Sequence, residues 1–261
     1  MKIDVQPLKE STGARSLRRA IEILGLIESK GRGLSVSEIV GELSLPRSTA
    51  YEIVRVLLET RLLAQEDSDA KFKLGARLFE LGMHYRSHDR LLQEGSRILA
   101  ALRDETGETV QLSILDGDRV NIVLKEEGRR AVRIISDVGS RVPVNWSAAG
   151  RLLVSDLGDV ELKKFLERTI AQSPTGQAEM NVPNLMGQIR AYRKRGYSTE
   201  TNEANEHAGC IAAPVLNDTQ SCIAAISLAA PESRLKSEDF ERLKSGVQSA
   251  ANQLSASLYP A

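Results

Sequence analysis

Apolar residues between positions 35 and 57 recur at the spacing of two short helices joined by a turn. The first helix has one apolar face, made of Val36, Ile39, Val40 and Leu43. Ser35 and Glu38 have the spacing of a capping box, which marks its start. Pro46 suits the first turn of the second helix, because its missing N–H would have no partner there. The inward face of this second helix consists of Ala50, Ile53, Val54 and Leu57.

The outward positions of the second helix are mostly hydrogen-bond donors: Arg47, Ser48, Thr49, Tyr51, Glu52 and Arg55. Bases and phosphates are both contacted by donors of this kind. A helix that presents them near its N-terminus is typical of one that enters the major groove of DNA. We therefore expect residues 46–57 to form a recognition helix.

The flanking segments complete a small DNA-binding domain. Upstream, one apolar stripe predicts a third helix, with Leu17, Ala20, Ile21, Leu24 and Ile27 facing inward. Downstream, two short extended runs, 62–65 and 71–74, are separated by an acidic turn and predict a β-hairpin. A hairpin directly after a recognition helix is the wing of a winged helix-turn-helix. Three amphipathic helices could also form a plain helical subdomain, but the cap, the proline, the donors and the hairpin together favour DNA binding.

Beyond residue 75 the pattern mixes helices and strand pairs. Helices are expected at about 75–88, 90–105, 147–155, 159–169, 184–195 and 237–258. The helix at 90–105 has an inner face made of Leu91, Ile98, Leu99 and Leu102. Strands are expected at 109–115, 119–125, 132–136, 210–216 and 222–229, with Asp116-Gly117 as a hairpin turn and 138–143 as a loop. This order predicts an α+β fold in which helices cover an antiparallel sheet.

Length and charge refine the expected function. A chain of 261 residues favours two domains. Lysine plus arginine equals aspartate plus glutamate at 35 each, so no overall basic excess supports nucleic-acid binding. Arginines nevertheless gather in the first sixty or so residues. The candidate DNA contacts are Arg18, Arg47, Ser48, Thr49, Tyr51 and Arg55.

The sequence indicates a cytoplasmic protein. It has no apolar run long enough to span a bilayer and no signal-peptide pattern at its start. Its two cysteines, Cys210 and Cys222, fall in segments with the composition of buried strands, which fits reduced thiols. No membrane partner is expected.

Standard catalytic and cofactor motifs are absent. The Gly31-x-Gly33 segment is too short for a phosphate-binding loop, and no G-x-S-x-G elbow occurs. His84 and His88 have the spacing of a metal pair on a helix, although two solvated histidines are the favoured interpretation. His207 lacks further ligands nearby, and Cys210 opens an apolar strand, which is more typical of an inert thiol than of a nucleophile. We expect no catalytic residue, no metal and no cofactor.

Seven segments, in their order along the chain, resemble the IclR family of bacterial transcriptional regulators. They are SLRRAIEILGLIE, LSVSEIVGELSLPRSTAYEIVRVLLETRLL, KFKLGARLFELG, GETVQLSILDGD, VGSRVPVNWSAAGRLL, KRGYSTETNEANEHAGCIAAPV and AAISLAAPESRL. The first dozen residues have little periodicity, which predicts a flexible arm at 1–12. The resemblance implies a winged helix-turn-helix domain at 13–75 and a linker helix at 76–89. It also implies an effector-binding domain at 90–261 with a GAF-like or PAS-like antiparallel sheet. Members of the family form dimers through the N-terminal domains and often tetramers through the effector domains.

The resemblance also implies where a ligand binds. In family members that bind small organic acids, backbone N–H groups hold the carboxylate at the start of the helix after a G-x-R-x-P loop. The corresponding residues are Ser147, Ala148 and Ala149. This position has a physical basis, since a helix N-terminus offers free N–H donors and a positive dipole end to an anion.

Further ligand contacts follow from the same resemblance. The acidic residue of the family falls on Glu200, its cysteine on Cys210, and the first serine of its last strand on Ser227. Glu200 is one methylene longer than the usual aspartate, and Ala229 replaces a second serine. Trp146, the only tryptophan, immediately precedes the helix. These differences predict a ligand that is larger or less polar on one side than a two- or three-carbon keto acid.

The expected function is therefore that of a ligand-responsive regulator, a repressor of a catabolic operon. Its expected partners are double-stranded operator DNA, a small anionic metabolite such as an organic acid or semialdehyde, and a second copy of the chain. An enzyme acting on a small organic acid through the C-terminal domain is the alternative, and the missing catalytic constellation argues against it. A nucleoid-type DNA binder without a ligand would need a markedly basic chain.

Overall fold

The computed structural model describes residues 12–66, 70–129 and 137–260. The chain divides into two compact units, residues 1–88 and 89–261, each with a hydrophobic core of its own. Three expectations fall outside the described residues: the arm before Thr12, the tip of the wing at 67–69, and the strand at 132–136.

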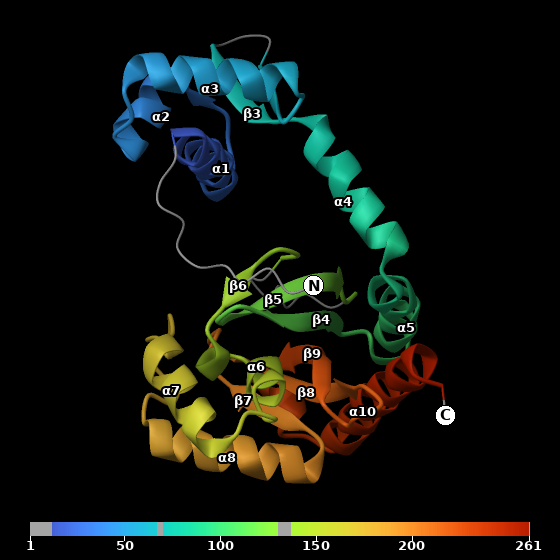
Figure 1. Ribbon diagram of the computed structural model, residues 1–261. Helices are drawn as coiled ribbons and strands as arrows, with labels where there is room; N and C mark the ends of the chain where they lie inside the picture. Colours follow the sequence, from blue (N-terminus) through green and yellow to red (C-terminus); the bar gives the residue numbers. More distant parts are fainter. Residues whose placement is uncertain (1–11, 67–69, 130–136, 261) are drawn as a thin grey trace. The chain divides into compact units, whose positions relative to one another are not determined.

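The first unit is a winged helix-turn-helix (Figure 1). Its elements are α1 (Thr12–Lys30), β1 (Leu34–Ser35), α2 (Val36–Leu43), α3 (Arg47–Glu59), β2 (Leu63–Gln65), β3 (Lys71–Leu74) and α4 (Ala76–His88). The first three helices share one apolar core, and the strands form a small antiparallel sheet in the order β1-β3-β2. The hairpin β2–β3 occupies the position expected for the wing.

The turn between the two central helices depends on a few local interactions. Ser35 Oγ accepts a hydrogen bond from the Glu38 N–H at 3.3 Å, and Glu38 Oε2 accepts one from the Ser35 N–H at 2.8 Å, so the capping box is present. Ser35 also ends β1, a two-residue strand that the sequence did not predict. Pro46 lies at the N-cap of α3, one residue before the helix, rather than in its first turn.

The inner face of α1 differs from the predicted one. Ile23 and Ile27 are buried, whereas Leu17 and Ile21 are 64% and 61% exposed. The helix therefore has a second apolar patch, one turn in length, that faces away from the core of its own unit.

The second unit is built on a six-stranded antiparallel sheet in the order β6-β5-β4-β9-β8-β7. Its strands are β4 (Thr109–Asp116), β5 (Arg119–Glu126), β6 (Arg141–Val142), β7 (Ser198–Thr201), β8 (Ala208–Leu216) and β9 (Cys222–Pro231). Its helices are α5 (Arg90–Thr106), the 3-10 turn η1 (Val144–Trp146), α6 (Ala148–Leu153), α7 (Asp159–Thr169), α8 (Val182–Arg195), α9 (Glu232–Leu235) and α10 (Asp239–Leu258). The fold class is α+β, as predicted.

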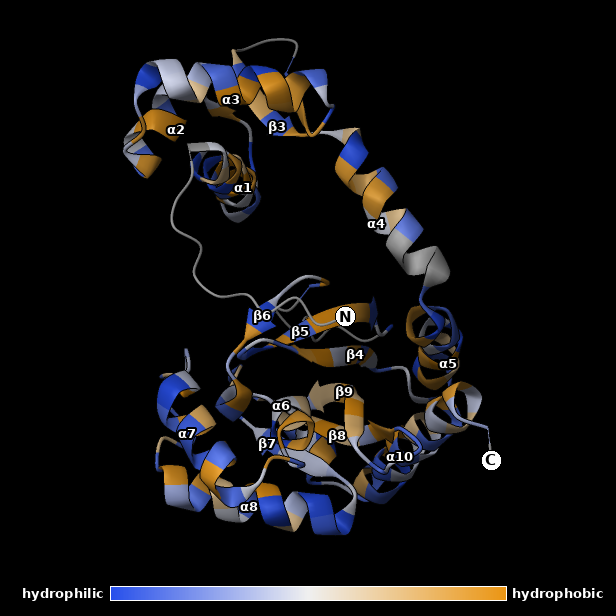
Figure 2. Cartoon of the chain, in the orientation of Figure 1, coloured by the Kyte–Doolittle hydropathy of each residue, from blue (hydrophilic) through white to orange (hydrophobic). Residues whose placement is uncertain are grey.

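Helices cover both faces of this sheet (Figure 1). On one face, α5 and α10 pack against the apolar side chains of β4, β8 and β9. Gly95 brings α5 close, because an added Cβ would come within 3.0 Å of Leu112 and Leu124. On the other face, α6 packs on β8 and β9, and α7 and α8 lie outside it. Strands β4 and β5 carry several hydrophobic residues each (Figure 2), and the first five residues of β4 are buried on both faces, whereas β5 alternates buried and half-buried positions.

Several details of the second unit depart from the predictions. On α5, Ile98, Leu99 and Leu102 are buried as predicted, but Leu91 is only half-buried at the edge of this face, and Leu92, which was not predicted, is buried. The expected loop at 138–143 contains β6, which pairs with β5. Strand β7 was not predicted, although it supplies the edge of the sheet beside β8. The hairpin β4–β5 is present, with Gly117 at φ +62°, where glycine meets no steric penalty.

Candidate ligand-binding site and DNA-contacting surface

The outer face of α3 presents the predicted DNA-contacting residues. Arg47, Ser48, Tyr51 and Arg55 are exposed, and Thr49 is half-buried. Arg55 Nε donates to Glu59 Oε1 at 2.9 Å, an exposed pair one helical turn apart. The remaining candidate, Arg18, is exposed on α1 and so does not belong to the row on α3.

A cavity of about 230 Å³ lies in the second unit, between the sheet and the start of α6. Its lining includes all seven residues predicted to bind the ligand: Trp146, Ser147, Ala148, Ala149, Glu200, Cys210 and Ser227. These residues come from η1, α6, β7, β8 and β9, so only the tertiary fold brings them together. The structure thus places all seven in one cavity.

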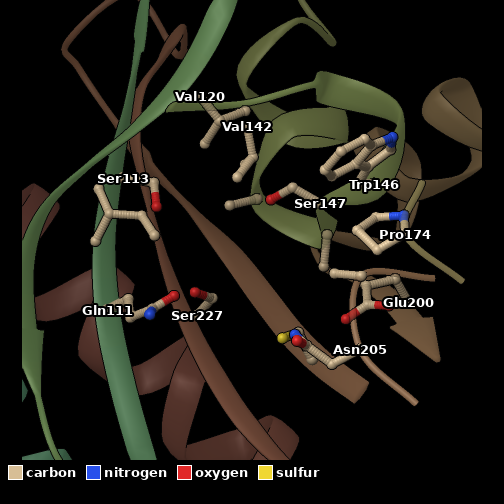
Figure 3. A pocket seen from close by; sticks show the side chains of 15 residues that line it. Gln111, Ser113, Val120, Val142, Trp146, Ser147, Pro174, Glu200, Asn205 and Ser227 are labelled. Atoms are coloured by element: carbon tan, nitrogen blue, oxygen red, sulfur yellow. The ribbon is translucent and has the colours of Figure 1, made fainter. Parts of the chain in front are cut away.

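Sequence reasoning missed eight residues of the lining: Gln111, Ser113, Val120, Ile122, Val142, Pro174, Ala204 and Asn205. Gln111 and Ser113 carried a signal, because they are polar residues two apart on an otherwise apolar strand and therefore share one face. Gln111 is the register partner of Ser227, and Figure 3 shows Gln111, Ser113 and Ser227 across the cavity from Trp146, Pro174 and Glu200. Pro174, Ala204 and Asn205 lie in loops and carried no such pattern.

The start of α6 forms one wall of the cavity. Ser147 is its N-cap, and Ser147 Oγ accepts a hydrogen bond from the Gly150 N–H at 3.2 Å. The first N–H groups of a helix have no partner within the helix, and here they belong to Ala148 and Ala149. Both side chains are a single methyl group, so a ligand can approach the backbone closely.

Trp146 forms a second wall, and its position is fixed by hydrogen bonds. Its indole Nε1 donates to the carbonyl of Ala171 at 2.7 Å. The neighbouring Asn145 is fully buried, and its Nδ2 donates to the carbonyls of Ala171 and Glu179 at 3.0 and 3.2 Å. The indole is therefore tied to the 170–181 loop.

Glu200 is the one carboxyl group of the lining and is only 5% exposed. It faces its register partner Cys210 across β7 and β8, and Glu200 Oε2 accepts a hydrogen bond from the Glu203 N–H at 3.2 Å. Burial raises the pKa of Glu200 to about 7, despite the hydrogen bonds from Cys210 and Glu203, which lower it. The carboxyl group is therefore protonated in a large part of the molecules at neutral pH.

Cys210 is a neutral thiol in this environment. Desolvation, followed by the adjacent Glu200 carboxyl, raises the pKa of the thiol well above its ordinary range. A thiolate, the reactive form of cysteine, is thus disfavoured. Cys210 can serve as a hydrogen-bond partner but is poorly suited to nucleophilic attack.

The charge of the lining restricts what the cavity can hold. None of its fifteen described residues is a lysine, arginine or histidine. A buried anion needs either a cation or several hydrogen-bond donors. The site can provide donors for one anionic group at the start of α6, and it offers no cation for a second.

Within the described residues, no cluster of three histidine, cysteine or acidic side chains has the geometry to hold a metal ion. Along the described helices, none is both long and apolar enough to cross a membrane.

Both units match known domain families. Residues 16–67 match the IclR helix-turn-helix domain, and residues 83–256 match the family described as bacterial transcriptional regulator IclR C-terminal. The HTH-type transcriptional repressor AllR of Escherichia coli (strain K12) is 30% identical over 246 residues, which cover 94% of this chain and 91% of that protein.

Solved structures show the same fold. The crystal structure of the Thermotoga maritima IclR superimposes with a TM-score of 0.77 at 25% identity, over 94% of this chain and 98% of that one. An IclR homologue from Microbacterium hydrocarbonoxydans, crystallised in complex with 4-hydroxybenzoate, gives a TM-score of 0.83 at 23% identity, over 93% and 98%. The chain therefore belongs to the IclR family of bacterial transcriptional regulators, and it is a ligand-responsive DNA-binding regulator rather than an enzyme.

Proposed function

We propose that this regulator represses a catabolic operon and that a small organic acid or semialdehyde releases it from the operator. The observation that carries the proposal is the cavity, which joins a helix start suited to an anion with a neutral polar end around Glu200. The relative from Escherichia coli is named as a repressor, which favours repression over activation. Because the DNA target lies in the cytoplasm of a bacterium, we place the protein there.

The ligand in this proposal carries one carboxylate. Its oxygens accept hydrogen bonds from the backbone N–H groups of Ala148 and Ala149, and its other end faces Glu200, Cys210 and Ser227. A dicarboxylate would bury a second charge without a cation, which costs several kcal/mol. A protonated Glu200 can instead donate a hydrogen bond to a hydroxyl or carbonyl group. The site thus favours a hydroxy acid, a keto-acid hydrate or a semialdehyde.

The size of the cavity and its walls favour a compact ligand with an apolar side. Pockets for drug-sized molecules span roughly 300–1,000 Å³, and this one measures about 230 Å³. Trp146 and Pro174 supply apolar surface on one side of the cavity, and Ile122, the register partner of Ser113, supplies it on the other. A small metabolite with more carbon than a two- or three-carbon keto acid would fill this space best.

We assign DNA contacts to the outer face of α3. Arg47, Thr49 and Tyr51 lie against base edges or the adjacent phosphates in this proposal, whereas Ser48, Arg55 and the wing position the duplex backbone. Arg18 on α1 adds a further phosphate contact. The exposure of α3 supports this assignment, since a helix that enters a groove needs a free outer face.

The proposed regulator acts as a homodimer. One winged domain covers only a few base pairs, so firm operator binding requires two half-sites. Exposed apolar side chains on α1 and α4 offer a surface for a second copy: Leu17, Ile21, Phe79, Leu81 and Met83. Pairing of the second units would extend the dimer to a homotetramer.

The ligand acts on DNA indirectly, because its cavity and α3 belong to different units. Binding energy changes operator affinity only through a difference between competent and incompetent arrangements of the dimer. A coupling free energy of about 1–3 kcal/mol changes operator affinity by roughly 5- to 150-fold.

Removing Ser227 and Glu200 together tests the cavity. A thermal-shift screen of organic acids and semialdehydes first identifies a ligand, since a ligand that binds the folded state stabilises it. We expect the S227A/E200A variant to lose both the thermal shift and the release of DNA while it keeps its operator affinity without ligand. The matched control is S245A/E161A, which alters the same residue types at exposed positions on α10 and α7. A normal response from S227A/E200A would show that the ligand binds elsewhere.

A further inference from the structure

Two loops border the cavity opposite Gln111 and Ser227 (Figure 3). The 170–181 loop contributes Pro174, and the 202–207 loop contributes Ala204 and Asn205. Neither loop has regular secondary structure. Backbone hydrogen bonds close each loop on itself, from the Gly176 N–H to the carbonyl of Ser173 and from the Asn202 N–H to the carbonyl of Ala208. The two loops are joined to each other through Glu203 and Thr175.

Glu203 connects both loops and the cavity. Its carboxylate forms a hydrogen-bonded ion pair with the guanidinium group of Arg151. Its backbone N–H donates to Glu200 Oε2 at 3.2 Å, and its backbone carbonyl accepts from Thr175 Oγ1 at 2.7 Å. Thr175 directly follows Pro174, and Glu203 directly precedes Ala204, so these bonds lie one residue behind the lining on each loop.

Arg151 anchors this arrangement to α6. The side chain is 1% exposed, and its guanidinium group also donates to the carbonyl of Asn145 at 2.9 Å and to that of Thr199 at 3.1 Å. Removing one partner of a buried ion pair leaves an uncompensated charge, which is strongly unfavourable. The Arg151–Glu203 pair is therefore a firm link between the loop and the helix whose first turn contains Ala148.

We propose that Glu203 is a positioning residue of the effector site, which holds the wall of Pro174, Ala204 and Asn205 in place across the cavity from Gln111 and Ser227. Glu203 does not line the cavity itself. It acts through Arg151, Thr175 and the N–H bond to Glu200. This inference rests on the proposed role of the cavity as the effector site, but its test needs no effector.

Trp146 provides the measurement. It is the only tryptophan of the chain, it lines the cavity, and its indole is bonded to Ala171 in the 170–181 loop. Quenching of its fluorescence by acrylamide, a small neutral molecule, reports how readily this wall opens. The full chain is measured without effector, well below its melting temperature.

Two variants remove different bonds of Glu203. Glu203→Gln removes the charge and keeps both backbone bonds, whereas Thr175→Val removes one hydroxyl on the other loop without a change of charge. Because loops open at low free-energy cost once their bonds are lost, we expect each variant to raise the quenching constant of Trp146 roughly twofold or more. Thr175→Val keeps the test valid if Glu203→Gln fails to fold.

Glu108→Gln is the matched control. Glu108 forms a comparably buried ion pair with Arg234 in the same unit, and neither residue lines the cavity. We expect this variant to lose thermal stability without a change in quenching. Unchanged quenching in Thr175→Val, or an equal rise in Glu108→Gln, would overturn the positioning role. Failure of organic acids to bind would contradict the proposed function and leave this test intact.

Discussion

Glu200 is almost fully buried, and the Arg151 guanidinium group, which acts on it electrostatically, forms an ion pair with Glu203 instead. The carboxyl group therefore remains protonated at a pH where most carboxyl groups are ionised. In this form it is a hydrogen-bond donor, which removes the repulsion that an ionised Glu200 would exert on an anionic ligand.

The protonation of Glu200 predicts a pH dependence of stability. Between its ordinary pKa of 4.5 and the folded value of about 7, the folded protein holds a proton that the unfolded chain has released. The free energy of unfolding therefore falls as pH rises through this window. Each unit of pKa corresponds to about 1.4 kcal/mol, so the decrease from this group amounts to about 3 kcal/mol.

Glu200→Gln isolates this effect, because glutamine cannot ionise. We expect the wild-type free energy of unfolding, relative to that of the variant, to decline from pH 5 to pH 8. Urea denaturation followed by the fluorescence of Trp146 measures it in the second unit. Parallel pH profiles for the two proteins would mean that Glu200 ionises normally in the folded state.

At the scale of the element, α3 is the part of the first unit that the sequence predicted most completely. Its four inward residues, Ala50, Ile53, Val54 and Leu57, are all buried. Its outer face ends in the Arg55–Glu59 pair, which holds the Arg55 side chain along the helix. We therefore expect the first turns of α3 to contact bases and Arg55 to contact the DNA backbone.

Substitutions on α3 separate these two roles. If Arg47 or Tyr51 contacts bases, its replacement by alanine reduces the free energy of DNA binding by about 1–3 kcal/mol and relaxes the sequence preference. Arg55→Ala, in contrast, weakens binding to all DNA sequences equally. The wild-type protein first selects its preferred DNA from a random pool. The affinity of each variant for the selected DNA and for unselected DNA then measures both effects. Arg97→Ala, an exposed arginine on α5, is the control. Unchanged affinity in both Arg47→Ala and Tyr51→Ala would refute the recognition-helix assignment.

Elements that depend on distant partners were harder to predict. The long helices and the hairpins β2–β3, β4–β5 and β8–β9 follow from local periodicity and turn residues, because those signals lie within each segment. Strands β1, β6 and β7 have two to four residues each, and only pairing with β3, β5 and β8 makes them strands. The lining of the cavity shows the same difference. The positions of Gln111 and Ser113 could be predicted from the alternation of side chains along a strand, whereas those of Pro174 and Asn205 depend on how two loops meet in the folded protein.

At the scale of the whole molecule, two apolar residues of α1 that were predicted to lie in the core are instead candidates for a contact with a second copy of the chain. Leu17 and Ile21 continue the apolar pattern of the helix, so the sequence could not distinguish a face for the core from a face for a partner. Their exposure in the single chain supports the proposed contact between copies, because exposed apolar patches are typical of protein–protein interfaces. The same reasoning applies to Phe79 on α4.

A charge on this surface tests the assembly. We expect Ile21→Lys to convert the proposed dimer to a monomer and to reduce operator affinity, without unfolding the protein, because the side chain is exposed. Analytical ultracentrifugation measures the change of mass, and Val160→Lys, at a similarly exposed position on α7, is the control. A wild-type chain that is monomeric and still binds its operator with full affinity would contradict the model of assembly.

Strand β4 limits how this protein can be engineered as a biosensor. Its alternate side chains divide between two faces: Gln111 and Ser113 line the cavity, while Val110 and Leu112 belong to the core beneath α5. A redesign of Gln111 that shifts the strand would therefore also disturb the packing of α5. Val142 and Pro174 belong to the short edge strand β6 and to a loop, respectively. Substitutions that change ligand specificity are best made at these two positions, because they can alter the shape of the cavity without disturbing the packing of α5 on β4.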